Sequence, residues 1–555
     1  FLVDSPNDSI EGIYEKYKEV ALLSKHGGGI GISYSKVRSR GSLIKGTNGK
    51  SSGITPWLKT LDSSVAAVNQ GGRRKGACCV YLETWHADIE SFLELRDNTG
   101  DESLRTHNVN IANWVPDLFM KRVESDALWS LFDPSKHPLL ADTYGEEFEK
   151  IYLEAENNKT YEKQVKARDL YGRMMRTLAQ TGNGWMTFKD ASNLKSNQTS
   201  VPNEVIHLSN LCTEILEVNS SNEVSVCNLG SINLSKHLNG NNFDFDKLRK
   251  TVDIAIRQLN KVIDTTYYPI ANAKNSNLRW RPVGLGIMGL QDVFFQLRLP
   301  FDSSDALALS KQISEEIYLQ ALSTSADIAK VEGPHQDFFQ TRAAKGFLQP
   351  DLWNSSKGQD KRFIEIKEKI KKYGLRNSLL IAIAPTATIA SIVGCYECIE
   401  PQVSNIFKRE TLSGEFLQIN QYLVAELKKN NLWNDFIKSE IIDNNGSIQN
   451  IEAIPQELKT LYKTAWEVPQ KALIDLAVAR GEFIDQSQSL NLFMETPNIG
   501  KLSSMYFYGW KQGLKTFYYL RSRPATEIKK TKSLVNDASA VACSLENPEM
   551  CESCG

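Results

Sequence analysis

The feature that most limits the folds open to this chain is an uncharged run of twenty residues, "NSLLIAIAPTATIASIVGCY", from Asn377 to Tyr396. Its length is close to that of a membrane-spanning helix. However, Pro385 stands near its middle and four Ser or Thr residues interrupt it, and an internal proline breaks or kinks a helix. The first part, "SLLIAIA", is typical of a short strand buried on both faces that ends at the proline. We therefore predict a buried sheet here and no membrane span.

Helical and strand-like segments alternate along most of the chain. "DSIEGIYEKYKEVALLSK" has capping residues at Asp8 and Ser9 followed by apolar residues at helical spacing. Short apolar segments such as "SVCNLGSINL" are typical of strands, and their alternation with helices favours an α/β architecture with a buried sheet. We expect a mainly helical insertion near 407–480. Residues 525–555 have few large apolar side chains and no periodicity, so we predict a flexible tail after a folded region spanning 1–524.

Composition excludes some classes of function. A chain of 555 residues with 41% apolar content can form a large soluble core. Its net charge of −1 argues against a dedicated nucleic-acid or membrane-surface role. Nine cysteines are too few for a secreted disulfide scaffold, and their number is odd. This indicates a reducing, cytoplasmic compartment in which single thiols react or bind metal.

The segment "SNLCTEI" places Asn210, Cys212 and Glu214 two residues apart. In an extended strand these three side chains would point to one face. A structural cysteine prefers apolar neighbours, so an amide and a carboxyl group on either side of a thiol suggest chemistry. An edge strand with a polar outer face explains the same pattern.

Other cysteines are candidates for redox or metal chemistry. Cys227 lies fifteen residues after Cys212 and is predicted to lie on the next buried strand, where a core cysteine is the commoner case. The terminal pair Cys551 and Cys554 suits thiol–disulfide exchange on a mobile segment. Half of a zinc site is the alternative, but the second Cys-x-x-Cys, Cys395 and Cys398, lies about 150 residues away.

Two loops are candidates for anion binding. "PTATIAS" reads as a strand-to-helix turn whose free backbone N–H groups could hold a phosphate, although an ordinary capped helix is the commoner case. The residues concerned are Thr386, Ala387, Thr388 and Ile389. "QGGRRKG" carries Arg73, Arg74 and Lys75 at a glycine turn, which is either a solvated tip or a loop that contacts an anionic ligand.

Two further patterns are weaker. Gly284-x-Gly286-x-x-Gly289 matches the spacing of a dinucleotide fingerprint and is the basis for a rival interpretation, a nicotinamide dehydrogenase. We reject it because polar and basic residues precede the glycines where a strand is required. The adjacent Tyr518 and Tyr519 fill a core by default, and the pair alone does not indicate a redox role.

Taken together, these motifs resemble the large, catalytic subunit of class I ribonucleotide reductase, from Asp8 to Cys554. The resemblance rests on these segments in this order: "DSIEGIY", "SKHGGGIG", "GTNG", "QGGRRKGA", "SNLCTEI", "VCNL", "KYGLRNSLLIAIAPTATIASI", "SGEF", "FIDQSQSLN", "MYFYGWKQGLKTFYYLRSRP" and the terminal Cys-x-x-Cys. It implies a ten-stranded α/β barrel with the "SNLCTEI" loop inserted at its centre. It also implies radical-based reduction of ribonucleoside diphosphates to deoxyribonucleotides for DNA synthesis.

The resemblance assigns roles to the candidate residues. Cys212 would become a thiyl radical that takes the ribose 3′ hydrogen, with Glu214 as base and Asn210 holding ribose hydroxyls. Cys227 would be one of two cysteines that end as a disulfide, which the tail cysteines would reduce again. Thr386 to Ile389 would hold the substrate diphosphate. Tyr519 would receive the radical and Tyr518 would pass it to Cys212.

The resemblance also implies effectors and partners. A deoxynucleotide or ATP would bind at a dimer interface made by the first helices, at Asp8, Ser9, Ile10, Lys25, Arg38, Lys45 and Gly46. Gln70 and Arg73 to Lys75 would pass effector identity to the substrate site. The partners would be a second copy, a small subunit whose metal cofactor supplies the radical, and thioredoxin or glutaredoxin. No metal would bind to this chain.

The sequence departs from the family in three places. The second redox cysteine should stand immediately before Phe1, so a complementary N-terminal segment or chain is expected. The alternative is an inactive or split fragment that binds nucleotides without turnover. The "QGGRRKG" loop is one residue shorter than in some relatives, and Cys395 and Cys398 stand where no cysteines are expected.

Overall fold

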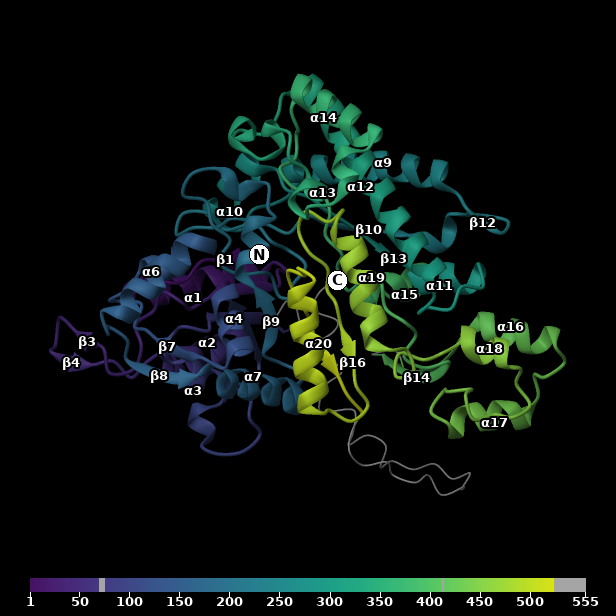
Figure 1. The fold of residues 1–555 in the computed structure, drawn as a ribbon, viewed down its shortest axis with the longest axis horizontal. Helices are drawn as coiled ribbons and strands as arrows, with labels where there is room; N and C mark the ends of the chain where they lie inside the picture. Colours follow the sequence, from purple (N-terminus) through teal and green to yellow (C-terminus); the bar gives the residue numbers. More distant parts are fainter. Residues whose placement is uncertain (69–74, 412–413, 524–555) are drawn as a thin grey trace.

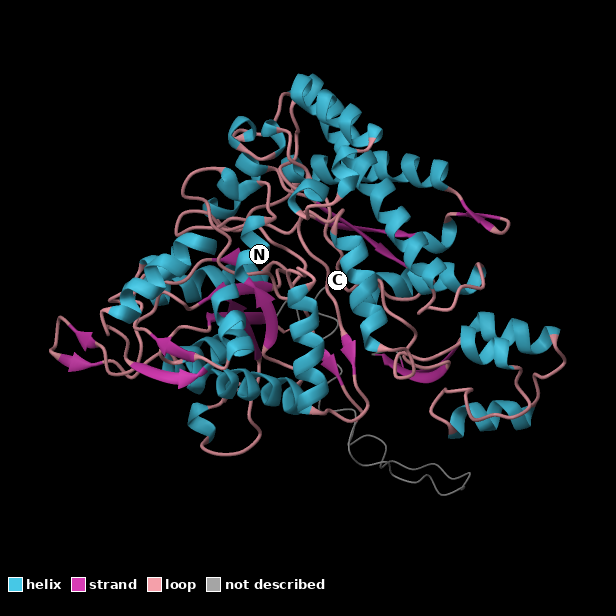
Figure 2. Ribbon diagram, in the orientation of Figure 1, coloured by secondary structure: helices cyan, strands magenta, loops and turns pink. Residues whose placement is uncertain are grey.

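The computed structural model describes residues 1–68, 75–411 and 414–523, with short strands near the centre and helices packed around them (Figures 1 and 2). The predicted tail lies outside the described residues. So do five of the residues singled out above: Gln70, Arg73, Arg74, Cys551 and Cys554.

The first half of the chain builds a parallel sheet in the order β1-β2-β5-β6-β9. Every residue of these strands is buried, as expected for a parallel sheet covered on both faces. The strands are β1 (Leu2–Val3), β2 (Ile30–Ser33), β5 (Cys78–Glu83), β6 (Val109–Val115) and β9 (Trp185–Phe188). The helices around them are α1 (Ile10–Lys25), α2 (Thr55–Ala67), α3 (Ile89–Leu93), α4 (Asp117–Ser125), α5 (Leu139–Asp142), α6 (Gly145–Asn157), α7 (Ala167–Thr181) and α8 (Lys189–Leu194).

The second half of the chain has fewer regular ladders. β10 (Leu229–Asn233) pairs in parallel with β13 (Gly284–Met288), and β16 (Leu492–Phe493) pairs with β17 (Leu520–Arg521). The glycines of the rejected dinucleotide pattern thus begin inside a strand, where Gly286 lets the Ala382 backbone approach closely.

The strand predicted over "SLLIAIA" lies next to β13 but forms only single bridges, Leu285 to Ile381 and Ile383 to Gln488. The Asp485 carboxylate accepts the N–H groups of Leu380 and Ile381, both at 2.8 Å. A side chain therefore replaces the ladder partner that the sequence suggests.

Antiparallel bridges join the two halves at both edges of the first sheet. Leu2 of β1 pairs with Ser225, and Thr187 of β9 pairs with Thr516. Among the described residues, these ladders and bridges connect ten segments, in agreement with the α/β barrel that the sequence predicts.

The helices of the second half cover this side of the barrel. They are α9 (Phe245–Thr265), α10 (Ala271–Trp280), α11 (Leu290–Gln296), α12 (Ser304–Glu332), α13 (Gln349–Leu352), α14 (Lys361–Tyr373), α15 (Ala387–Val393), α19 (Gln470–Gly481) and α20 (Ile499–Lys511). None of the helices within the described ranges is both long enough and apolar enough to cross a membrane.

A small lobe with its own apolar cluster extends from the barrel, at the right of Figure 1. It contains the hairpin of β14 (Ile406–Thr411) and β15 (Gly414–Ile419), then α16 (Gln421–Lys429), α17 (Asp435–Asp443) and α18 (Gln456–Leu461). The remaining short strands form three antiparallel pairs: β3 (Leu43–Ile44) with β4 (Gly49–Lys50), β7 (Leu128–Leu131) with β8 (Lys163–Lys166), and β11 (Leu238–Asn239) with β12 (Asn242–Phe243).

Candidate active site

The "SNLCTEI" segment is a buried loop between α8 and β10. Asn210, Cys212 and Glu214 are 5%, 2% and 1% exposed. The extended strand predicted for them is wrong, because residues 211–213 form a turn and Thr213 has a φ of +67°. The turn still brings its ends together, since the Asn210 side-chain oxygen accepts the N–H of Ile215 at 3.1 Å.

Side-chain hydroxyl groups hold the backbone of this loop. Four of its carbonyl groups accept a hydrogen bond from a hydroxyl: Asn210 from Tyr81 at 2.6 Å, Cys212 from Ser489 at 2.5 Å, Thr213 from Thr516 at 2.8 Å and Ile215 from Ser209 at 2.6 Å. Buried backbone groups need such partners, and a loop inside a barrel cannot obtain them from a strand ladder. The hydroxyls therefore fix a loop that has no regular secondary structure.

Strand β2 contacts the same loop through its backbone. A Cβ atom at Gly31 would lie 2.1 Å from the carbonyl oxygen of Ser209. Glycine is therefore required here because the two backbones lie too close together for any side chain.

The carboxyl group of Glu214 is suited to proton transfer. Burial raises its pKa, while hydrogen bonds from the side chains of Asn210 and Ser489 act in the opposite direction. A raised pKa makes the carboxylate a stronger proton acceptor than an exposed glutamate.

Cys227 lies in the loop just before β10, not on the strand where the sequence predicts it. Its thiol lies close to the start of the chain, since the amino group of Phe1 is 3.5 Å from Sγ of Cys227. Burial raises the pKa of this thiol to about 11, against the opposing effect of that amino group.

The predicted phosphate loop is a strand-to-helix turn as expected. Thr386 is the residue before α15 and has a φ of +58°. Its Oγ1 accepts the N–H of Cys398 at 2.9 Å. The pair Cys395 and Cys398 follows α15 directly. Cys398 supports the start of the helix, whereas the N–H of Cys395 donates to the carbonyl of Ala390 near its other end.

The rings of Tyr518 and Tyr519 lie against each other, with centroids 4.3 Å apart. Trp185 contacts both, at 4.7 and 4.9 Å. Tyr518 lies two residues after Thr516. The hydroxyl of Thr516 donates to the carbonyl of Thr213, the residue that follows Cys212. The aromatic pair is therefore anchored to the same frame as the loop.

The predicted effector residues separate into groups. Arg38 donates to the carboxylate of Asp8 at 2.8 Å and to its carbonyl at 2.9 Å, and Ser9 caps α1 through the N–H of Gly12. Lys45 and Gly46 lie at the exposed tip of the β3–β4 hairpin, and Lys75 is exposed beside α2. Ile10 lies at the first turn of α1. Lys25 is at the opposite end of this 16-residue helix, about 24 Å away.

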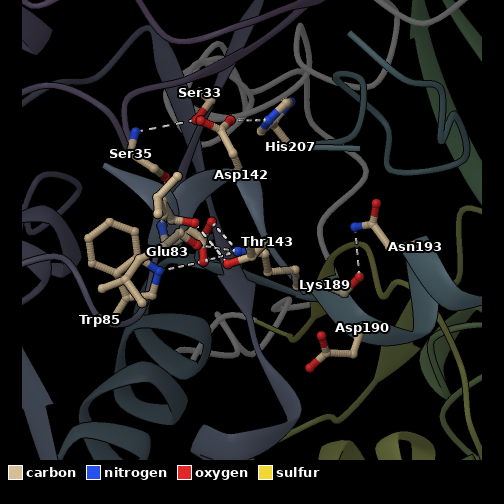
Figure 3. A network of polar contacts seen from close by, with 12 residues as sticks. Ser33, Ser35, Glu83, Trp85, Asp142, Thr143, Lys189, Asp190, Asn193 and His207 are labelled. Carbon is tan, nitrogen blue, oxygen red and sulfur yellow. Dashed lines mark hydrogen bonds and ion pairs between the residues drawn. The ribbon is translucent and has the colours of Figure 1, made fainter. Parts of the chain in front are cut away.

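A buried polar network lies at the strand ends, near the residues that lead into the loop (Figure 3). Nζ of Lys189 lies 2.7 Å from the Glu83 carboxylate, which also accepts from Nε1 of Trp85 at 2.6 Å. Nearby, the ring of His207, a residue three positions before Asn210, contacts the Asp142 carboxylate at 2.8 Å. Sequence reasoning missed this network.

Sequence reasoning also gave no role to Tyr81, Ser489 or Thr516. The signal available for two of them was a hydroxyl inside otherwise apolar or amide-rich buried segments, "CCVYLE" and "FIDQSQSLN". Nothing in these segments indicates which carbonyl group the hydroxyl meets.

Comparisons with known proteins agree with this geometry. The family model described as "Ribonucleotide reductase, barrel domain" matches residues 1–520. The chain is 46% identical to the ribonucleoside-diphosphate reductase large subunit of Danio rerio, over 100% of this chain and 72% of that protein. It is 44% identical to the ribonucleoside-diphosphate reductase large chain of Schizosaccharomyces pombe, over 100% of this chain and 73% of that protein. It is 47% identical to the ribonucleoside-diphosphate reductase large subunit of Variola virus, over 100% of this chain and 72% of that protein. The chain therefore belongs to the ribonucleotide reductase large-subunit family.

Proposed function

We propose that this chain is the catalytic subunit that reduces ribonucleoside diphosphates to 2′-deoxyribonucleoside diphosphates. The observation that carries the proposal is the buried loop, which places the side chains of an asparagine, a cysteine and a glutamate within five residues and is held by hydroxyl groups from both halves of the barrel. Its relatives carry the name of this reaction.

Each of the three side chains supplies one requirement of the reaction. Cys212 gives the hydrogen atom of its S–H group to the oxidised Tyr518 and, as a thiyl radical, takes the hydrogen atom from C3′ of the ribose. Glu214 accepts the proton of the 3′-hydroxyl, and Asn210 donates to the ribose hydroxyls. Burial of all three keeps water away from the radical. The oxidising equivalent would come from the metal cofactor of a small subunit, and Tyr519 and Tyr518, whose ring centroids lie 4.3 Å apart, would carry it to Cys212.

The two electrons for reduction come from a pair of thiols. Cys227 and a second cysteine give up two hydrogens, one to the 2′-hydroxyl, which leaves as water, and one to C2′. Their two sulfurs then form a disulfide. The distance of 3.5 Å between the Phe1 amino group and Cys227 supports a second cysteine joined to Phe1, because that residue would lie beside Cys227. Cys551 and Cys554 would then reduce the disulfide, with electrons from thioredoxin or glutaredoxin.

Substrate binding is proposed at the start of α15. The first N–H groups of a helix lack partners within the helix and suit a phosphate. Residues 387–389 are half-buried, so a diphosphate could reach them from solvent.

A homodimer completes the proposed effector site. Lys25 is too far along α1 to join Asp8 and Arg38 in one protomer. A second copy with α1 running antiparallel would bring the groups together. Ile10 and Tyr14 are 64% and 55% exposed on α1, which gives that helix an apolar surface for such a contact.

We place the enzyme in the cytoplasm, on the cysteine content alone.

The test is Cys212→Ser in the full-length protein with the small subunit and a dithiol reductant. We expect loss of cytidine diphosphate reduction with unchanged substrate binding, measured by product formation and by equilibrium dialysis. Cys395→Ser, which removes a half-buried thiol after α15, is the control and should keep turnover. If Cys212→Ser turns over, Cys212 has no part in the mechanism. If wild type binds nucleotides but never turns over with every partner supplied, the alternative of a non-catalytic fragment is correct.

A further inference from the structure

Ser489 makes two contacts inside the active-site loop. Its hydroxyl lies 2.5 Å from the carbonyl oxygen of Cys212 and 3.1 Å from Oε2 of Glu214. Ser489 is fully buried, and its N–H donates to the carbonyl of Ile383 at 2.9 Å. Its backbone is therefore fixed, and rotation of the hydroxyl is the freedom that remains.

We propose that Ser489 is a positioning residue that couples the protonation of Glu214 to the hydrogen bond that holds the backbone of Cys212. The inference rests on the proposed function, in which Glu214 gains and loses a proton during turnover. It names a residue beyond those that contact the substrate.

The coupling follows from the number of protons available. A serine hydroxyl has one proton to donate and two lone pairs with which to accept. It cannot donate to the Cys212 carbonyl and to a Glu214 carboxylate at the same time. Both contacts are satisfied together only when Glu214 is protonated, donates to Oγ of Ser489, and leaves the serine proton for Cys212.

Ionisation of Glu214 changes this arrangement. A charged carboxylate is a stronger acceptor than a peptide carbonyl, so it competes for the serine proton and weakens the hold on Cys212. When Glu214 takes the proton of the substrate 3′-hydroxyl, the hydrogen-bonded chain from Glu214 through Ser489 to Cys212 forms. The loop would then be fixed most firmly while the substrate radical exists, and the proton returns at the end of the cycle.

Other titratable groups that face Glu214 come from several elements. They are Tyr81 on β5, Cys227 before β10 and Cys398 after α15. Burial raises the pKa of Tyr81 and Cys398, and that of Cys227 to about 11. These three groups therefore stay neutral in the range where Glu214 titrates.

The first experiment follows the two groups by infrared spectroscopy, which needs no turnover. The full-length protein is labelled with 1-¹³C-cysteine, and the spectrum of Cys212→Ser is subtracted to isolate the Cys212 carbonyl. We expect this band to move to higher frequency as pH rises. The midpoint of this change should equal the titration midpoint of the Glu214 carboxyl band, which is identified by its absence in Glu214→Gln. In Glu214→Gln the carbonyl band should not titrate. A band that is constant with pH in wild type overturns the proposal.

The second experiment compares Ser489→Ala with Ser487→Ala. Ser487 is a buried serine two residues away whose hydroxyl contacts Thr516 at 2.6 Å and not the Glu214 carboxyl group. A hydrogen bond to the charged form lowers a pKa, so Ser489→Ala should raise the titration midpoint of Glu214, and Ser487→Ala should leave it unchanged. Ser489→Thr, which keeps a hydroxyl, should restore the wild-type midpoint. Equal midpoints in all variants would leave Ser489 a purely structural role and refute the coupling.

Kinetics give a third readout. Misplacement of Cys212 should lower kcat about 10²-fold in Ser489→Ala with little change in KM. The pH at which kcat reaches half of its maximum should increase by the same amount as the titration midpoint of Glu214. An unshifted kcat profile contradicts the proposal. Absence of turnover in wild type with all partners would instead overturn the proposed function, and the infrared result would still decide the role of Ser489.

Discussion

The two halves of the barrel contact the central loop through different kinds of groups. In the first half, five strands pair in a continuous parallel sheet, which meets the loop through the backbone of Gly31 and through one hydroxyl, that of Tyr81. In the second half, the segments around 381–383 and 486–489 pair through single bridges. Their side chains, led by Ser489, donate to the loop instead.

This difference follows from how backbone groups are used. A regular ladder consumes the N–H and C=O groups of its strands, so the first half adds polar groups mainly at strand ends, as in the pair of Glu83 and Lys189. Where ladders are incomplete, hydroxyls and amides take over, and these are the directional contacts that fix Cys212 and Glu214. The first half thus contributes mainly shape and stability, and the second half mainly the position of the reacting groups.

The largest effect is expected for Tyr518→Phe, in the second half. Phenylalanine keeps the ring packed against Trp185 but lacks the hydroxyl that allows oxidation. Turnover should fall more than about 10³-fold, equivalent to roughly 4 kcal/mol of transition-state free energy. Thermal unfolding should be nearly unchanged. Tyr506→Phe, at a buried tyrosine of α20, is the matched control and should remain active. An active Tyr518→Phe would make this ring a packing residue like those of the first half.

Lys189→Met should produce the largest loss of stability, and it lies in the first half. The Lys189 side chain is fully buried, and its removal leaves the Glu83 carboxylate buried without its cation. Breaking such a pair costs about 3–5 kcal/mol. Urea unfolding of this variant should be compared with Lys163→Met, whose exposed pair with Glu90 is worth less than about 1 kcal/mol. Similar losses in both variants would show that the network of Figure 3 is not a stabilising element.

Gly31→Ala tests whether the first half holds the loop by shape. The added methyl group would overlap the carbonyl oxygen of Ser209, so strand and loop must separate at a cost of about 1–3 kcal/mol. The loss of transition-state free energy calculated from kcat should exceed the loss of unfolding free energy, because Ser209 is adjacent to Asn210. Gly172→Ala on α7, where a Cβ meets open space, should be neutral or slightly stabilising. Equal behaviour of the two variants would remove Gly31 from the comparison.

The sequence was more informative about the identities of the reacting residues than about their local geometry. The buried sheet followed from apolar runs between helices, but the barrel followed only from the family resemblance, because such runs suit many α/β folds. The extended conformation expected for Asn210 to Glu214 was wrong, because a period of two can also arise in a turn whose shape is set by distant partners. Tyr81 and Ser489 lie 129 and 277 residues from the carbonyl groups they hold. No local pattern encodes such a contact.

Tyr81→Phe should have the smallest effect, and it sharpens the comparison most directly. Tyr81 is the first-half residue that, like Ser489, donates to a loop carbonyl, but this contact does not include Glu214. Loss of one hydrogen bond should cost about 1 kcal/mol, while the ring stays packed edge-on to Trp114. We expect a decrease in kcat smaller than that of Ser489→Ala, with no shift in the pH dependence of kcat. If Tyr81→Phe moved the pH profile as far as Ser489→Ala, any loosening of the loop would suffice. The second half would then have no special link between the base and Cys212.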